Sequence, residues 1–152
     1  MESIRNSAKA IIIKEDQVLA IEHLDSDGEW YVLPGGGQRA GETLEAALLR
    51  ECFEEIGVKI RIGQLRYIRE YIGKNHEFWE EDGESHQVEF MFECMIAGGQ
   101  SPSLGSKPDS GQIGCVWLPL DEIMDYRLYP RAIRENLTNH SDTFVRYLGD
   151  IN

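Results

Sequence analysis

Three glutamates, Glu51, Glu54 and Glu55, lie close together in a segment with the pattern of an α-helix, Thr43 to Ile56. At about 100° per residue, Glu51 shares one helix face with both of the others. Crowded carboxylates repel one another unless a cation lies among them. Mg²⁺ and Mn²⁺ prefer oxygen ligands, and Mg²⁺ is usually completed by waters and substrate phosphates. The spacing therefore fits a divalent-cation site that a polyphosphate completes, while a solvated helix face is the simpler alternative.

A run of glycines, Gly35 to Gly37, follows Pro34 shortly before the predicted helix. Glycine admits positive φ angles and lets other groups come close to the backbone. The run therefore predicts a turn at which a backbone carbonyl or a phosphate oxygen can approach the glutamates.

The segment from Gly36 to Val58 reads G36-x5-E42-x7-R50-E51-C52-x-E54-E55-x-G57-V58, and it resembles the Nudix box. One position departs from the family pattern: Cys52 stands where a bulkier aliphatic residue is preferred, and a small apolar Cys can fill that packing position. The stretches WYVLPGGG before the box and VWLPLDEI after it also look family-like. The resemblance implies a Nudix fold, which is an α+β single-domain α/β/α sandwich with a mixed β-sheet.

The resemblance also implies roles for individual residues. Glu51, Glu54 and Glu55 would be the catalytic, metal-binding glutamates, and one of them, often the one at the position of Glu51, would orient or deprotonate water. The backbone carbonyl of Gly35 would complete the metal shell. A structural ion pair is implied between Glu42 and Arg50.

The catalytic base is the least defined part of the site. Many relatives place a further Glu a few residues before the Trp of a late strand, but Gln112 stands near that place before Trp117, and an amide cannot act as a base. Either the box alone suffices, or Asp109, Glu89 or Glu84 substitutes. Glu89, a further candidate metal ligand, lies on the polar face of its strand, which fits a pocket and solvent equally well.

The implied reaction is attack by water on a phosphorus of a pyrophosphate linkage, with Mg²⁺ or Mn²⁺ as the cofactor. The expected substrates are nucleoside triphosphates or modified triphosphates; the alternatives are dinucleoside polyphosphates and nucleotide sugars. The proline that ADP-ribose-cleaving relatives tend to show after the box is absent. Two other classes are a Nudix-type module that senses a nucleotide without cleaving it and an acidic protein-interaction domain. A sensor has no need to keep three mutually repelling glutamates.

Composition limits the partners. The chain has 152 residues, which suits one domain over residues 1–152, and a formal net charge of −12. Such a charge disfavours nucleic acid and anionic membranes, and a small nucleotide diphosphate would need bound cations to approach. No apolar run is long enough to cross a bilayer, so a cytoplasmic protein is expected. The three cysteines are far apart and predict no disulfide framework. A homodimer remains possible.

The elements that must position the glutamates follow from periodicity and turn residues. Apolar runs joined by Glu15-Asp16 predict a β-hairpin. Thr43 is a predicted helix cap and Gly57 a predicted stop, with Leu44, Ala47, Leu48, Phe53 and Ile56 on the apolar face. Further strands, short helices and loops are predicted as follows: strands in 30–33, 58–72, 85–97 and 111–118; helices in 120–124 and 130–139; loops in 73–84 and 98–110.

Other side chains could determine substrate specificity, although a role in packing or at the surface is commoner for each residue type. The aromatic candidates for stacking on a base are Trp30, Tyr31, Tyr67, Tyr71, Phe78 and Trp79. Phe78 and Trp79 lie in an acidic loop, which fits a lid. Arg39, Arg66 and Arg69 could hold phosphates, and His76 and His86 could bind metal or transfer protons.

Overall fold

The computed structural model describes residues 3–138 and 144–152, and a mixed β-sheet is its largest feature. The strands are β1 (Arg5–Lys14), β2 (Gln17–Asp25), β3 (Gly28–Val32), β4 (Gly35–Gly37), β5 (Ile60–Ile72), β6 (His86–Ile96), β7 (Gln112–Pro119), β8 (Leu128–Tyr129) and β9 (Arg146–Asp150). Within the described residues their order is β8-β3-β2-β1-β6-β5-β9, with β4 beside β1 and β7 beside β2. Because β1 pairs in parallel with β6 and antiparallel with β2 and β4, the sheet is mixed, as predicted.

The predicted hairpin is confirmed and builds the centre of the sheet. Ile13 pairs with Val18, and the turn residues Glu15 and Asp16 have φ angles of 51° and 59°. Positive φ at both central residues matches the tight turn whose twist suits paired strands. β1 pairs with β2 in the hairpin and with β4 and β6 along the rest of its length. This one strand therefore connects β8-β3-β2 on one side with β6-β5-β9 on the other.

The predicted helix is also confirmed as α1 (Leu44–Ile56). The Thr43 hydroxyl accepts the Ala46 N–H at 3.0 Å, and Gly57 ends the helix with a φ of 68°. The prediction that Phe53 belongs to the apolar face is wrong, because its side chain is 52% exposed while Cys52 is buried. Phe53 lies five residues after the buried Leu48, which turns it roughly 140° away around the helix.

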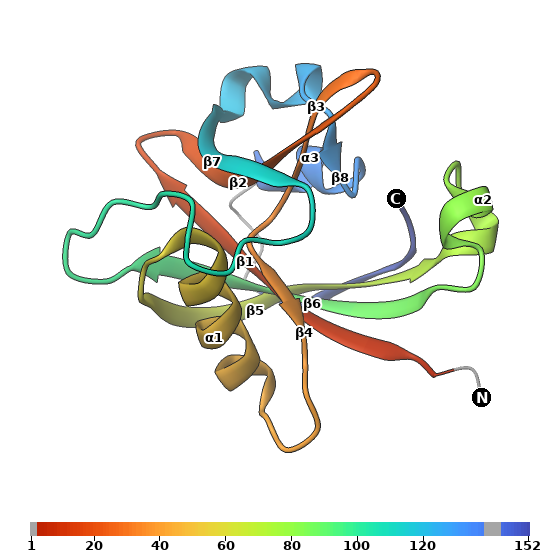
Figure 1. Ribbon diagram of the computed structural model, residues 1–152, viewed down its shortest axis with the longest axis horizontal. Coiled ribbons are helices and arrows are strands. Elements are labelled where there is room, and N and C mark those ends of the chain that lie inside the picture. The colour runs from red at the N-terminus through yellow and green to blue at the C-terminus, as the bar shows by residue number, and fades with distance from the viewer. Residues whose placement is uncertain (1–2, 139–143) are drawn as a thin grey trace.

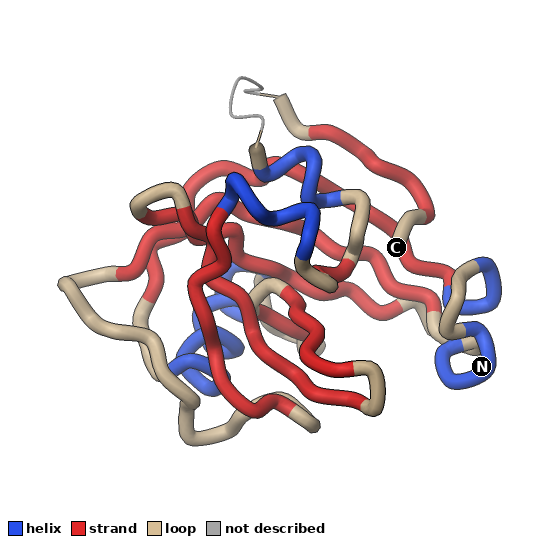
Figure 2. Tube along the Cα trace, turned by 90° about the horizontal axis from the view of Figure 1, so that it is seen from above, coloured by secondary structure: helices blue, strands red, loops and turns tan. Residues whose placement is uncertain are grey.

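The sheet is covered on both faces, which confirms the α/β/α sandwich (Figures 1 and 2). One hydrophobic core joins α1, through Leu48, Cys52 and Ile56, to alternate residues of β1 and β6. The other core joins the opposite face of β1 to the short helices η2 (Leu120–Asp125) and α3 (Ile133–Leu137). The alternation predicted for the strand at 85–97 accounts for this division, since Phe92 and Cys94 belong to the first core and Met91 to the second.

Segment 73–84, predicted as a loop, contains two helical turns instead: η1 (Gly73–Asn75) and α2 (Trp79–Asp82). The helix predicted over 130–139 is shorter than expected and ends at Leu137; residue 139 lies outside the described residues. The short strands β4, β8 and β9 escaped prediction because they have few residues or consist of glycine. In the part of the chain that the structure describes, no helix is long and apolar enough to span a membrane.

Candidate functional site

The glycine strand β4 lies so close to its neighbours that side chains would collide there. A Cβ on Gly35, whose φ is 132°, would be 2.1 Å from the carbonyl oxygen of Ala8. A Cβ on Gly36 would be 2.6 Å from the carboxyl carbon of Glu51, and one on Gly37 would be 2.5 Å from the Arg5 guanidinium. The glycines therefore let α1 place the Glu51 carboxylate directly against the backbone of β4.

Arg50 joins this strand to the acidic face of α1. Its guanidinium donates two hydrogen bonds to Glu42, at 2.6 and 3.0 Å, and one to the Gly37 carbonyl at 3.0 Å. The same group contacts Glu51 at 2.9 Å and Glu54 at 3.4 Å. Hydrogen bonding to Arg50 lowers the pKa of Glu42 to about 2. A forked, charge-assisted pair of this kind fixes direction as well as distance, so it holds the turn before α1 against the helix.

Glu55 has a different environment from the other two glutamates. It is 3% exposed and accepts the Gly35 N–H at 3.1 Å. Burial raises its pKa to about 8, although the charge of Lys9 and the Gly35 N–H oppose that rise. The Lys9 ammonium donates to the carbonyl of Gly35 at 3.3 Å and to that of Leu33 at 3.4 Å. A buried carboxyl of this type is stabilised in its charged form by any further positive charge.

The donor set at this site suits a hard divalent cation. The carboxylates of Glu51, Glu54 and Glu55 and the carbonyl of Gly35 are all oxygen donors, the type that Mg²⁺ and Mn²⁺ prefer. Among the described residues, no three acidic, His or Cys side chains lie close enough to form a ready-made metal cluster. The three carboxylates do not converge because each has another partner: Glu51 and Glu54 pair with Arg50, whereas Glu55 accepts the Gly35 N–H. The residues fit a cation that gains its remaining ligands from water and phosphate.

Gln112 fastens the loop before β7 to the end of α1. It is 8% exposed, donates to the Glu55 carbonyl at 3.0 Å and accepts the Asp109 N–H at 2.9 Å. A carboxylate could accept but not donate, so the amide explains why glutamine stands here. Asp109 is exposed and its charge adds to the rise in the pKa of Glu55. Glu84 is exposed at the end of the α2 segment.

Glu89 is buried, which excludes the solvent interpretation of its strand face. It is 6% exposed and accepts two hydrogen bonds from the Arg69 guanidinium, at 3.0 and 3.1 Å. Burial alone would raise the pKa of Glu89, but the charges of Arg69 and Lys9 hold it below the usual range. The buried Arg69 is therefore committed to Glu89 rather than free in solvent.

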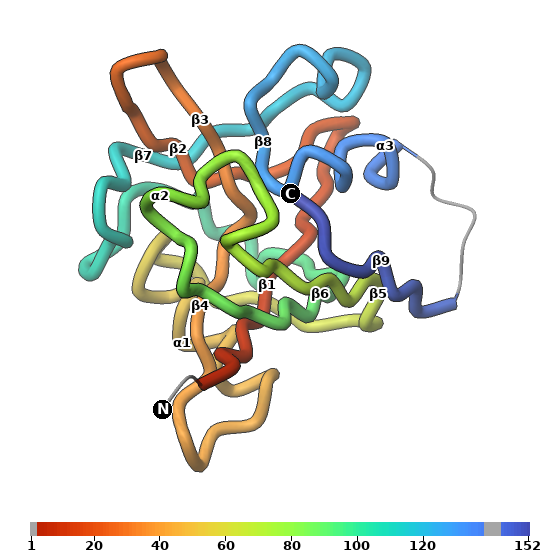
Figure 3. Tube along the Cα trace, turned by 90° about the vertical axis from the view of Figure 1, so that its right-hand side faces the viewer, coloured from red at the N-terminus to blue at the C-terminus, as the bar shows by residue number. Residues whose placement is uncertain are grey.

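A cleft of about 670 Å³ opens beside this ion pair. It is bounded by the β2–β3 turn, β5, α2, β8 and Asn152, which lie side by side in Figure 3. Trp30, Tyr71, Phe78 and Tyr129 provide its aromatic lining. A recess of about 30 Å³ lined by Lys9, Arg69, Glu89 and Tyr129 adjoins it and shares Arg69 and Tyr129 with it.

The aromatic candidates from the sequence divide accordingly. Trp30, Tyr71 and Phe78 line the cleft, whereas Tyr67 and Tyr31 belong to the second hydrophobic core. Trp79 is 59% exposed and is not among the residues that line the cleft. The lid hypothesis therefore rests on Phe78.

Four residues of this region carried no usable sequence signal: Arg5, Lys9, His23 and Tyr129. Only the strand pairing places Lys9 opposite Gly35 and brings His23 beside Gln112. His23 is 3% exposed and stacks on Trp30 with ring centroids 4.2 Å apart. Neither of its ring nitrogens has a hydrogen-bond partner among the described residues, and burial lowers its pKa while Asp109 opposes that effect.

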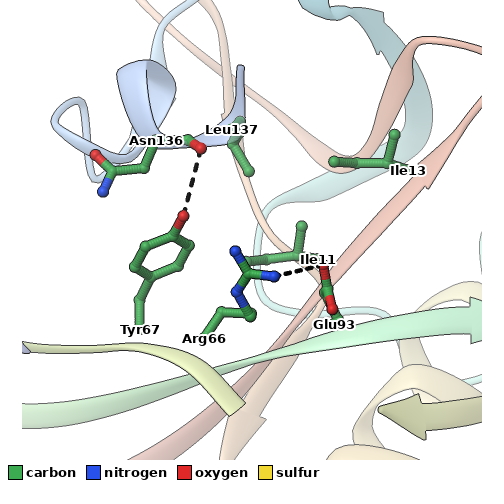
Figure 4. A pocket seen from close by; sticks show the side chains of 7 residues that line it. All are labelled: Ile11, Ile13, Arg66, Tyr67, Glu93, Asn136 and Leu137. Carbon is green, nitrogen blue, oxygen red and sulfur yellow. Dashed lines mark hydrogen bonds and ion pairs between the residues drawn. The ribbon is translucent and has the colours of Figure 1, made fainter. Parts of the chain in front are cut away.

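A second hollow lies farther along the same face of the sheet, between β1, β5 and α3 (Figure 4). It measures about 20 Å³, roughly the space that one water molecule needs. Tyr67 donates to the Asn136 carbonyl at 3.4 Å and Arg66 pairs with Glu93 at 3.0 Å, so both polar side chains are engaged across it. The hollow is too small for a nucleotide, unlike the cleft of about 670 Å³ beside Arg69.

Comparison with known proteins agrees with this architecture. The family model described as NUDIX domain matches residues 4–138. A MutT-like protein of Streptomyces ambofaciens is 27% identical over 129 residues, 84% of this chain and 72% of that protein. The uncharacterized Nudix hydrolase YvcI of Bacillus subtilis is 24% identical over 130 residues, 86% of this chain and 75% of that protein. The crystal structure of a MutT NUDIX hydrolase from Burkholderia pseudomallei superposes with a TM-score of 0.70 at 21% identity, covering 91% of this chain and 100% of that one.

The fold and the glutamate-bearing helix thus define a hydrolase that acts on pyrophosphate bonds. The chain belongs to the Nudix family, as its resemblance to the Nudix box implies.

Proposed function

We propose that this Nudix hydrolase is an Mg²⁺- or Mn²⁺-dependent pyrophosphohydrolase of nucleoside triphosphates or modified nucleoside diphosphate derivatives. One observation carries the proposal: the acidic face of α1 packs on β4 so closely that only glycine fits between Glu51 and the strand. That arrangement places oxygen donors beside the glycine strand, and Lys9, which pairs with Gly35 of that strand, lines a recess that shares Arg69 and Tyr129 with the cleft of about 670 Å³.

In this proposal Glu51, Glu54 and Glu55 hold the cation together with the Gly35 carbonyl. A bound divalent cation would neutralise charge on the phosphates and lower the pKa of a bound water. Glu51 is the favoured residue for orienting or deprotonating the attacking water, because its carboxylate lies against the glycine strand and is only part-buried, whereas Glu55 is buried. Attack on phosphorus then requires positioning and electrostatic stabilisation, with no covalent intermediate.

Two further pairs position these groups. Arg50 and Glu42 keep the turn and the helix in register, as their forked hydrogen bonds indicate. Lys9 and Arg5 flank β4 with positive charge, so they can attract the phosphates of a substrate toward an otherwise acidic protein. Glu89 remains a candidate metal ligand. To bind a cation, its carboxylate would have to give up the hydrogen bonds that Arg69 donates to it.

The test is a panel of nucleoside triphosphates, dinucleoside polyphosphates and nucleotide sugars, assayed with Mg²⁺, with Mn²⁺ and with a chelator. Only when metal is present should product analysis find a nucleoside monophosphate, together with pyrophosphate from a triphosphate, a sugar phosphate from a nucleotide sugar, or the remaining nucleotide from a dinucleoside polyphosphate. Tight binding of a nucleotide without turnover of any diphosphate would contradict the proposal and support a sensor instead. Equal turnover with the chelator present would contradict the metal requirement.

A further inference from the structure

We infer that the cleft beside Arg69 selects a nucleotide in which a group attached to the phosphates carries a positive charge, either on the alkylated base of the nucleoside or on a quaternary ammonium group. The inference rests on the proposed function for the hydrolytic step, but it concerns other residues. Its basis is the combination of aromatic rings and unpaired carboxylates that line this space.

Three of the four aromatic rings that line the cleft form one contacting group around Tyr129. Trp30 meets Tyr129 edge to face, with centroids 6.1 Å apart and planes at 72°. Phe78 meets the same Tyr129 at 5.5 Å and 75°. Rings set at steep angles to one another present π faces in several directions, as in the aromatic cages that bind quaternary ammonium and other diffuse cations. Tyr129 already has a cation over its ring, the Arg131 guanidinium, 5.3 Å from the centroid. The stacked ring of His23 covers one face of Trp30 and fixes its orientation.

The charges that line the cleft point to the same ligand. Four carboxylates face it, from Asp25, Asp27, Glu81 and Asp82. The guanidiniums among its described lining residues are both paired with carboxylates: Arg69 with Glu89, and Arg127 with Asp25 at 3.0 and 3.2 Å.

Among the residues that the structure describes, Glu81 and Asp27 have no cationic partner in the cleft, and the Asp82 carboxylate accepts the Tyr71 hydroxyl there. The lining is therefore net acidic toward a ligand. An anionic attached group, such as a further phosphate group, would be repelled by these carboxylates. A neutral base could stack on the rings and donate hydrogen bonds to Glu81 and Asp27, but it would lack the attraction between unlike charges. A cationic moiety is attracted both by the rings and by the carboxylates, because a ring quadrupole and a carboxylate each favour a nearby positive charge.

The experiment compares matched substrate pairs on the intact protein with Mg²⁺. One pair is 7-methylguanosine triphosphate against guanosine triphosphate, and the other is CDP-choline against CDP-glycerol. We expect kcat/KM to be about tenfold higher for the cationic member of one pair. The pair that shows this preference identifies the preferred cation as an alkylated base or as a quaternary ammonium alcohol. Equal kcat/KM values within both pairs would overturn the inference.

Variants assign the preference to the cleft. The double substitution Asp27→Asn with Glu81→Gln should reduce the preference several-fold. The control, Glu29→Gln with Glu80→Gln, makes the same charge change at exposed neighbours that do not line the cleft and should leave the preference intact. An unchanged preference in the first double variant would overturn the assignment to these carboxylates.

Calorimetry separates this inference from the proposed hydrolysis. Binding of 7-methylguanosine monophosphate against guanosine monophosphate, and of phosphocholine against glycerol phosphate, requires no turnover. If no diphosphate is hydrolysed, the proposed function fails, while tighter binding of one cationic ligand would still support the cleft assignment. Equal binding within both pairs would overturn it whatever the outcome of the hydrolysis assay.

Discussion

The glycine strand with α1 and the aromatic cleft beside Arg69 are built in opposite ways. The first is one continuous stretch, residues 35–58, in which Arg50 binds Glu42, Glu51 and Glu54 across a single turn. The second collects side chains from the β2–β3 turn, β5, α2 and β8, which are separated by up to a hundred residues or so along the chain. Contacts in the first region are buried or part-buried ion pairs and close backbone approaches, whereas the second is an open space with exposed acidic residues.

The difference separates two tasks. Chemistry on a pyrophosphate needs fixed distances, and a helix packed on a glycine strand supplies them. Choice of the attached group needs only a shaped and charged surface, which short turns can change without disturbing the core. We therefore expect changes in the first region to act on kcat and changes in the second to act on KM.

The largest effect is expected for Glu55→Gln. The substitution removes the carboxylate that a bound cation would keep in its charged form but keeps the volume and the bond from Gly35, so kcat should fall by about a thousandfold or more. Glu45→Gln, in the exposed first turn of α1, is the matched control and should retain activity. Steady-state kinetics together with circular dichroism would check both variants. Retention of most activity in a folded Glu55→Gln protein would remove Glu55 from the site.

A smaller loss is expected for Gly36→Ala. The added methyl would lie 2.6 Å from the Glu51 carboxyl carbon, so the carboxylate must move and kcat should fall by about ten- to a hundredfold. At Gly114 the nearest atom to an added methyl is 3.5 Å away, on the Glu22 side chain, so Gly114→Ala is a suitable control. Equal kcat values for the two variants would show that Glu51 need not contact the strand.

In the cleft, Trp30→Leu should raise KM by about fivefold and leave kcat nearly unchanged. The ring lines the cleft and stacks on His23, so its loss removes stacking area without touching α1. Trp79→Leu removes an equally large but 59% exposed ring and should change neither constant. A fall in kcat for Trp30→Leu would indicate that the cleft takes part in the chemistry.

The smallest effect is expected for Glu42→Gln, on stability rather than on turnover. The pKa of Glu42 is about 2 in the folded protein, below its ordinary value of 4.5, so its charge stabilises the fold above that ordinary value. This contribution is lost as the pH falls from 4.5 toward 2. The wild type should therefore have the higher urea midpoint at about pH 6, and the gap to Glu42→Gln should narrow at about pH 3. A gap that does not change with pH would mean that the Arg50 pair contributes nothing through its charge.

The sequence predicted the first region far better than the second. Local rules decide the hairpin turn at Glu15-Asp16, the cap at Thr43 and the stop at Gly57, and all three act between neighbours in the chain. The misassignment of Phe53 shows the limit of such rules, since helical spacing alone does not say where the apolar arc ends.

Contacts that depend on long-range strand pairing could not be predicted from the sequence. The register of β1 with β4 places Lys9 at Gly35, and the pairing of β5 with β6 places Arg69 against Glu89. Neither register is visible in local periodicity. The role of Gln112 was hidden for the same reason, because its partners, the Glu55 carbonyl and the Asp109 N–H, meet only in the folded chain.

The central claim is that α1 and the glycine strand form a divalent-cation site, and Mn²⁺ binding measured by electron paramagnetic resonance tests it directly. The wild type and Glu45→Gln should bind Mn²⁺ with the same saturable affinity, whereas Glu55→Gln should bind at least about tenfold more weakly. Identical Mn²⁺ affinities in all three proteins would contradict the claim.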